Sequence, residues 1–183
     1  MVAQTPSAPH VRSSDPRLAE LIDRATRESA TFRGLVDTVQ ASNGIVYVEP
    51  GACGHGVQAC LKIWMQVSGA NRFVRIAINQ STRRCDIEVM SAIGHELQHA
   101  IEVFSEPGIK DGVTMFSFLE RTAPSIQKRF ETTAALNVGD RVDDELRAAS
   151  RTTPQVVRRG CLSVNVGSPW NRSARAVFRP ANT

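Results

Sequence analysis

The sequence predicts an α+β domain in which a helix and a small sheet precede a second set of helices. Apolar residues recur at steps of three and four over residues 18–39 and again from residue 90, which is the spacing of amphipathic helices. Between residues 45 and 79 apolar and polar residues alternate, as they do in half-buried strands. A chain of 183 residues, 42% of them hydrophobic and 22% charged, is typical of one globular domain.

The first predicted helix begins after Asp15, which is a good N-cap and is followed by a proline at the first helical position. Its core-facing stripe comprises Leu18, Leu21, Ile22, Ala25, Phe32, Leu35, Val36 and Val39. We expect this long helix to bend near Ser29 or Gly34. The Asn-Gly pair at 43–44 predicts the turn that ends it.

Three strands are predicted to follow. The first spans residues 45–49 and stops at Pro50, because proline cannot donate to a sheet. The other two, over 61–68 and 73–79, are joined by a turn at 68–71. Each is expected to bury one face, formed by Leu61, Ile63, Met65 and Val67 in the first and by Val74, Ile76 and Ile78 in the second.

The run of residues 87–104 contains no proline and predicts a second helix. Its core-facing stripe comprises Met90, Ile93, Leu97, Ile101 and Phe104. At about 100° per residue, His95 and His99 lie on the opposite side from this stripe. We therefore expect the helix to bury one face in the core and to present both histidines to a cleft.

This helix carries the sequence His95-Glu96-Leu97-Gln98-His99, an HExxH motif. Residues four apart lie on one face of a helix, so the two histidines can bind one Zn²⁺ from the same side. The glutamate beside the first histidine is then placed to polarise a metal-bound water. A solvated helix with two exposed histidines is the alternative interpretation.

The segment from Ala92 to Ile101, with uncharged residues around the HExxH trio, resembles the zincin metallopeptidases. The resemblance implies a zincin-like fold: an N-terminal backing helix and a small, mainly β sheet, then the HExxH helix and a further helix that carries the third ligand. The motif does not continue as in metzincins, and no histidine follows His99. The third ligand is therefore expected to be a carboxylate, as in a compact gluzincin, or less favourably His55.

In glutamate-ligand zincins a glutamate on a separate downstream helix completes the site, so the resemblance implies Glu131 as ligand, with Glu120 as second choice. Glu131 lies in a predicted helix over residues 129–150. Its apolar stripe also contains Ala135, Val138, Val142 and Ala149. A carboxylate on such a face is costly unless it is paired or metal-bound. Alternatively, Glu131 caps a helix start or pairs with Arg129 or Arg141.

Glu102 also lies on the histidine side of the HExxH helix. It is separated from His95 by about 10 Å of helical rise, too far for both to bind one metal. We interpret Glu102 and Glu106 as hydrogen-bond partners of the ligands or as a solvated rim.

The residues between the two site helices are expected to form a turn-rich connection over 105–112 and a short apolar helix that ends near Pro124. Core packing is the expected role of its apolar side chains, in preference to a specificity pocket. These side chains are Met115, Phe116, Phe118 and Leu119.

The resemblance implies a zinc-dependent metallohydrolase, a peptidase that acts on a peptide or protein substrate. His95, His99 and Glu131 would bind Zn²⁺, and Glu96 would take a proton from the zinc-bound water and pass it to the leaving amine. One alternative is a catalytically inactive, zincin-like metal-binding or interaction module. The other is a basic nucleic-acid-binding protein.

The cysteines of the chain indicate the cellular compartment in which the protein is found. There are four of them, namely Cys53, Cys60, Cys85 and Cys161. The spacing of Cys53 and Cys60 suits a small disulfide loop, and the even number suits two bridges. Disulfides predict an extracytoplasmic protein, secreted or periplasmic, whose signal peptide is not in this sequence. Four buried thiols in a cytosolic protein are the alternative.

We expect residues 1–14 to be a flexible tail, 15–151 to form the zincin-like domain, and 152–183 to be a basic strap packed on it. No acidic residue follows Glu145, whereas seven arginines do: Arg147, Arg151, Arg158, Arg159, Arg172, Arg175 and Arg179. Because few aromatic residues accompany them, a solvated strap is favoured over a nucleic-acid interface. No run of about 18 apolar residues occurs, so no membrane span is predicted.

Overall fold

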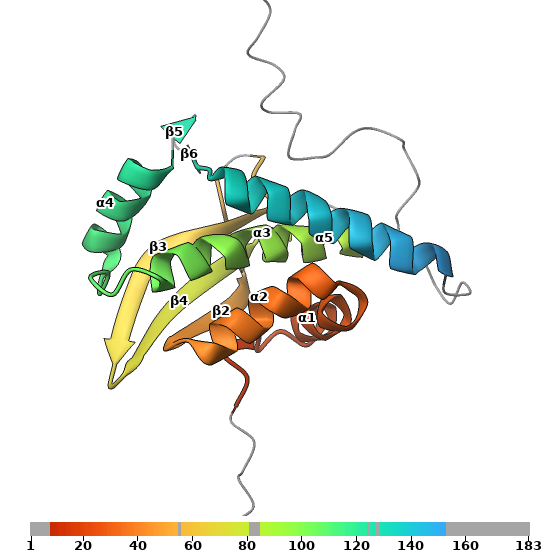
Figure 1. The fold of residues 1–183 in the computed structure, drawn as a ribbon, viewed down its shortest axis with the longest axis horizontal. Helices are drawn as coiled ribbons and strands as arrows, with labels where there is room; N and C mark the ends of the chain where they lie inside the picture. The colour runs from red at the N-terminus through yellow and green to blue at the C-terminus, as the bar shows by residue number, and fades with distance from the viewer. Residues whose placement is uncertain (1–7, 55, 81–84, 124, 127–128, 153–183) are drawn as a thin grey trace, which may run out of the picture.

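The computed structural model describes residues 8–54, 56–80, 85–123, 125–126 and 129–152. These residues form a four-stranded mixed sheet with helices packed against one face (Figure 1). The predicted α+β class is thereby confirmed in its general form. The predicted strap over 152–183 lies outside the described residues, apart from the helical backbone of its first residue.

The sheet consists of β1 (Val11–Arg12), β2 (Gly44–Pro50), β3 (Ala59–Ser68) and β4 (Asn71–Ile78), in the order β1-β2-β4-β3. The pairs β1–β2 and β2–β4 are parallel, whereas β3 and β4 form an antiparallel hairpin. The three predicted strands correspond to β2, β3 and β4. The strand β3 is at one edge of the sheet, next to the helix that carries the HExxH motif.

The strand β1 was not predicted, because Val11 and Arg12 fall in the stretch expected to be a flexible tail. Val11 pairs with Val46 of β2 and is only 4% exposed. A two-residue strand has no periodicity of its own, so this pairing becomes visible only in the folded chain.

The predicted long helix is instead two helices, α1 (Pro16–Glu28) and α2 (Ala30–Ala41), separated at Ser29. Asp15 caps α1 as predicted, since its carboxylate accepts a hydrogen bond from the Leu18 amide at 2.9 Å. Ser29 has an extended backbone, and its hydroxyl accepts from the Phe32 amide at 3.0 Å. Ser29 is therefore both the C-cap of α1 and the N-cap of α2, so the expected bend is a break.

The hairpin turn between β3 and β4 is at the predicted position, with Gly69 in the left-handed region at φ +58°. The predicted buried face of β3 is wrong in part. Met65 is buried, but Ile63 and Val67 are 42% and 44% exposed. The pairing register shifts between Leu61 and Met65, which disturbs the side-chain alternation at Ile63, whereas Val67 lies at the end of the strand beside the hairpin turn.

The HExxH motif lies on α3 (Asp86–Phe104), as predicted, and this helix packs across the sheet. Met90, Ile93 and Leu97 face the core and are fully buried. The opposite side of α3 is covered by α5 (Thr133–Thr152), the last helix of the described chain (Figure 1). The helix is thus buried on both sides, where the sequence had indicated a single buried face.

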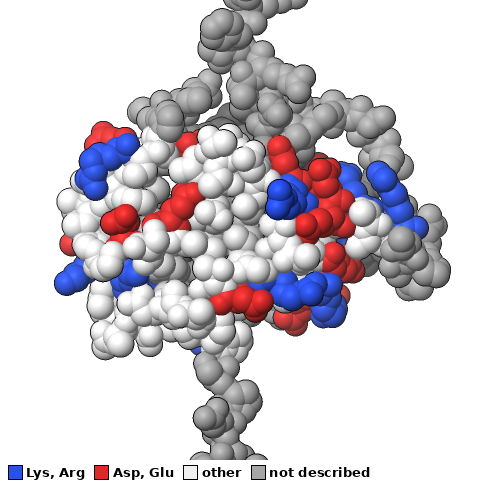
Figure 2. Space-filling model, viewed as in Figure 1, with Lys and Arg blue, Asp and Glu red and all other residues white. Residues whose placement is uncertain are grey.

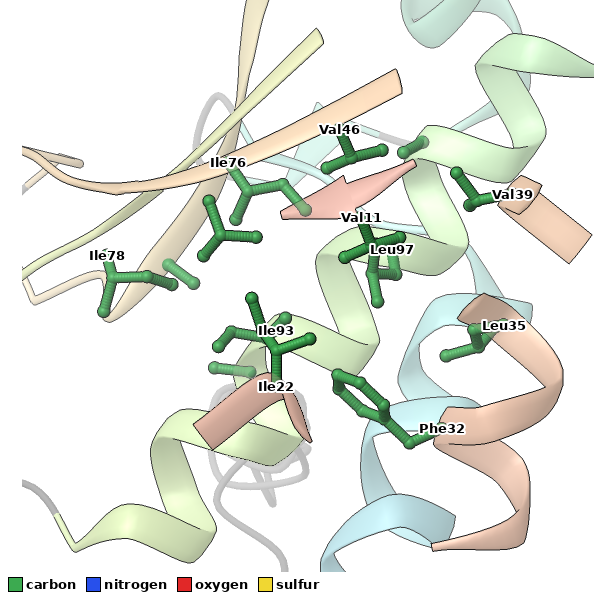
Figure 3. Close-up of a cluster of buried hydrophobic side chains, with 14 of the residues drawn as sticks. Val11, Ile22, Phe32, Leu35, Val39, Val46, Ile76, Ile78, Ile93 and Leu97 are labelled. Carbon is green, nitrogen blue, oxygen red and sulfur yellow. The ribbon is translucent and has the colours of Figure 1, made fainter. Parts of the chain in front are cut away.

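The core lies between the sheet, α1, α2 and α3, and Figure 3 shows ten of its side chains by name. They are Val11, Ile22, Phe32, Leu35, Val39, Val46, Ile76, Ile78, Ile93 and Leu97. Phe32 also approaches Gly94 of α3, where an added Cβ would be 3.4 Å from its ring and 3.2 Å from Val142 of α5. The small residue at position 94 therefore lets α2 and α5 pack closely on α3 beside His95.

The helix α4 (Gly112–Thr122) packs beside the edge strand β3 and precedes the short hairpin of β5 (Ser125–Ile126) and β6 (Arg129–Phe130). Core packing is confirmed for three of its apolar residues, since Met115 and Leu119 are buried and the partly buried Phe118 packs against the core. Phe116 is instead 43% exposed and its ring contacts that of Phe130, with centroids 5.5 Å apart.

The C-terminal end of α3 is attached to the sheet by Arg72 of β4, which is 7% exposed. Its guanidinium donates to the carbonyl oxygens of Phe104 and Glu106, the latter at 2.8 Å, and to Asn43 Oδ1 at 3.0 Å. Burial lowers the pKa of Arg72. The contacts fix where α3, and with it the HExxH motif, lies on the sheet.

Candidate metal centre

Three side chains from two parts of the chain meet beside α3. His95 and His99 lie on consecutive turns of α3, and Glu131 lies in the segment before α5. One donor atom from each residue lies within 4.8 Å of the others. The carboxylate oxygen Glu131 Oε2 is 3.0 Å from His95 Nε2 and 3.9 Å from His99 Nε2. The three residues named from the sequence as ligands are therefore brought together.

The position of Glu131 differs from the prediction in one respect. It was expected on the apolar face of a helix beginning at residue 129, but α5 begins at Thr133. Residues 129–130 form β6, so Glu131 reaches the histidines from a connection. The capping role considered for Glu131 belongs to Thr132, whose hydroxyl accepts from the Ala135 amide at 3.1 Å.

Both histidines are buried, with only 1% of His95 and 4% of His99 exposed, and the Glu131 side chain is 28% exposed. In the part of the chain that the structure describes, His99 Nε2 and Glu131 Oε2 are buried and make no hydrogen bond of good geometry, although Glu131 Oε2 lies 3.0 Å from His95 Nε2 and 3.9 Å from His99 Nε2. Such atoms are costly unless another group satisfies them. Two imidazole nitrogens and one carboxylate oxygen suit Zn²⁺ and other first-row divalent cations. The group could therefore hold a metal ion.

The ionisable groups of this site shift one another's pKa values. Burial alone would lower the pKa of His99, but the hydrogen bond to Glu102 and the attraction of the Glu131 carboxylate outweigh it and raise the pKa to about 10. Burial would raise the pKa of Glu131, but attraction to the imidazoles of His95 and His99 outweighs it and lowers the pKa to about 2. Without a metal, a proton on His99 therefore compensates the carboxylates around it. A metal cation would take over that compensation.

Glu102 is a hydrogen-bond partner of the histidine pair, one of the two roles predicted for it. Its Oε2 accepts a hydrogen bond from His99 Nδ1 at 3.0 Å. This contact leaves the other ring nitrogen, Nε2, free to face His95 and Glu131. The Oε1 atom of Glu102 accepts from the Thr132 hydroxyl at 2.7 Å. Glu106, for which the same two roles were predicted, is exposed to solvent.

Glu96 points toward the edge strand and is 7% exposed. Its Oε2 accepts a hydrogen bond of 2.7 Å from the backbone amide of Leu61 in β3. This amide adjoins the register shift of β3. Sequence reasoning missed Leu61 as a site residue, because a backbone donor carries no signature in side-chain pattern.

One other candidate for the third ligand does not join this group. Glu120, the second choice for third ligand, is exposed on α4 and is not among the three clustered residues. His55 lies outside the described residues.

The predicted disulfide between Cys53 and Cys60 is present, and it closes a loop of sequence separation 7. Cys60 directly precedes Leu61, so the loop is tied to the part of β3 that contacts Glu96. Cys85 is disulfide-bonded as well, and Cys161 lies outside the described residues. A disulfide is more common in proteins of oxidising compartments.

Comparison with known proteins assigns the chain to no family. No family model, curated protein or solved structure matches the chain. Among the described residues, no helix combines the length and the apolar character needed to cross a membrane.

Proposed function

We propose that the protein is a zinc-dependent hydrolase that cleaves peptide bonds. The observation that carries this proposal is the meeting of His95, His99 and Glu131 beside a glutamate that directly follows the first histidine. Two histidines and a carboxylate form a common protein ligand set of catalytic zinc. The likeness of the HExxH segment to zincins supports peptide-bond hydrolysis as the reaction class.

Zinc held by these residues would supply a Lewis acid that polarises the scissile carbonyl. Glu96 acts as the general base, which accepts a proton from the attacking water and then delivers it to the leaving amine. The Leu61 amide holds one carboxylate oxygen of Glu96 and so restricts its orientation. Glu102 fixes the His99 tautomer through Nδ1.

We propose that the substrate contacts the surface formed by β3 and α4. All large hydrophobic side chains exposed in the described part of the chain lie on these two elements, namely Ile63, Trp64, Val67, Val113 and Phe116. The elements are in contact, since a Cβ added at Gly112 would be 3.1 Å from the Ile63 carbonyl oxygen. Phe116 contacts Phe130, the residue before Glu131. The extracytoplasmic location is proposed on the basis of the Cys53–Cys60 disulfide.

Glu96→Gln tests the mechanism. The amide keeps the shape of the side chain and removes the base, so we expect hydrolysis to fall by about 100-fold or more while zinc content is unchanged. Purified protein is assayed on a peptide mixture by mass spectrometry, with and without chelator, and zinc is measured by atomic absorption. Glu106→Gln, an exposed carboxylate after the same helix, is the matched control. Wild-type activity in Glu96→Gln would contradict the mechanism.

A non-catalytic metal-binding module is the second candidate, and the burial of both histidines favours it. The same assay separates the two functions. Zinc bound at one equivalent without chelator-sensitive cleavage of any peptide would select the module.

A further inference from the structure

We propose that Thr132 is a positioning residue that, through Glu102, holds Glu131 against the two histidines. The inference rests on the proposed metal centre and concerns how its two separate parts are joined. His95 and His99 belong to α3, whereas Glu131 belongs to the connection between β6 and α5. Helices hold site residues more precisely than loops do, so a ligand in a connection depends more on neighbouring residues that fix its position.

The Glu102 carboxylate spans these two parts. Oε2 accepts from His99 Nδ1 at 3.0 Å, and Oε1 accepts from Thr132 Oγ1 at 2.7 Å. A further contact of 3.4 Å from Gln98 Nε2 to Oε1 comes from α3 itself. One carboxylate therefore contacts the ligand His99 and the neighbour of the ligand Glu131, so the positions of both ligands depend on one side chain.

The Thr132 hydroxyl makes two hydrogen bonds. It donates to Glu102 and accepts from the Ala135 amide at 3.1 Å, so its proton is directed at the carboxylate. Helix capping alone requires only the acceptor. The bond to Glu102 requires the donor as well, and this difference separates a positioning role from a structural one.

Three substitutions of Thr132 in the full chain distinguish these roles. Thr132→Ser keeps donor and acceptor, and Thr132→Val removes both. Thr132→Asp keeps a capping acceptor but offers no donor and repels Glu102. We expect zinc affinity close to wild type for Thr132→Ser and about 10-fold weaker for Thr132→Val and Thr132→Asp, the loss typical of a residue that supports a ligand.

Zinc affinity is measured by competition with a chromophoric chelator, and Co²⁺ is used as a spectroscopic probe. The visible bands of Co²⁺ report its ligands, so we expect them to change in Thr132→Val and Thr132→Asp and to be retained in Thr132→Ser. Circular dichroism of the metal-free variants confirms that each is folded. Adding Thr132→Val to Glu102→Ala should lower the zinc affinity no further, because Glu102→Ala already removes the hydrogen bond between Glu102 and Thr132.

Wild-type affinity and an unchanged Co²⁺ spectrum in Thr132→Asp would overturn the inference and leave Thr132 as a helix cap only. If the wild-type protein itself binds neither zinc nor Co²⁺, the metal centre and this inference both fall. The two failures are thus distinct.

Discussion

At the scale of single residues, the candidate metal centre consists of only three side chains, and they differ in how far the sequence predicts them. His95 and His99 could be identified from their spacing alone, because four residues of helix place them on adjacent turns. Glu131 is 32 residues further along the chain, and its approach to the histidines requires the whole α3–α5 arrangement. Glu131 is therefore the candidate ligand that most needs a direct test.

Glu131→Ala removes the only carboxylate of the His95, His99 and Glu131 group. We expect zinc affinity to fall by more than about 100-fold, beyond the loss typical of residues that only support a ligand. Glu120→Ala is the matched control, because Glu120 is exposed on α4 and lies outside the group. Equal zinc affinity in the two variants, measured by chelator competition, would exclude Glu131 as the third ligand.

At the scale of elements, the carboxylate of Glu145 joins α5 to the N-terminus of α2. It accepts from the Ser29 hydroxyl at 2.6 Å, from the Thr31 amide at 2.9 Å and from the Thr31 hydroxyl at 2.7 Å. Burial would raise the pKa of Glu145, but these hydrogen bonds outweigh it and lower the pKa below its ordinary 4.5. The charged form is therefore favoured in the folded protein.

Glu145→Gln should lower the free energy of unfolding by about 1 kcal/mol at pH 7, a reduced value because the side chain is only half-buried. A lowered folded-state pKa contributes stability above the unfolded value of 4.5, and this stability is lost as pH falls through the folded value. The difference between wild type and Glu145→Gln in urea unfolding should thus shrink in acid. Asp144→Asn, an exposed neighbour, should show no such difference.

Arg72 is the buried contact between β4 and the end of α3. Arg72→Met should lower the free energy of unfolding by about 3 kcal/mol, because the carbonyl oxygens of Phe104 and Glu106 lose a buried charged donor. Arg75→Met, on the same strand, removes a surface pair with Glu49 and should cost less than about 1 kcal/mol. Denaturant unfolding measures both, and equal losses would contradict the anchoring role.

The elements also differ in how far the sequence predicts them. Local signals identified α3, the hairpin turn at Gly69 and the cap at Asp15, because each depends on residues within one or two turns. The strand β1 and the register shift in β3 depend on pairing with distant residues, so they have no local signal. The Leu61 amide that contacts Glu96 was inaccessible to prediction for the same reason.

At the scale of the whole molecule, charged side chains are spread more widely than exposed large apolar ones. Figure 2 shows acidic and basic side chains at both ends of the face in view, over α4 as well as over α1 and the C-terminal part of α5. The exposed large hydrophobic residues of the described chain are confined to β3 and α4. His95, His99 and Glu131 lie between α3 and the start of α5. An ion bound by them would therefore link α3, which packs on the sheet, to α5, which covers it.

That position predicts a global effect of zinc on stability. An ion that binds only the folded chain at a hundredfold excess over its Kd adds about 2.7 kcal/mol to the free energy of unfolding. For a domain of this size the midpoint should rise by about 5 to 10 °C. Thermal unfolding followed by circular dichroism in Zn²⁺, with Mg²⁺ as the control cation, measures the shift. Because Glu131→Ala lacks the ligand beside α5, zinc should barely shift its midpoint, and a full shift in that variant would place the bound ion elsewhere.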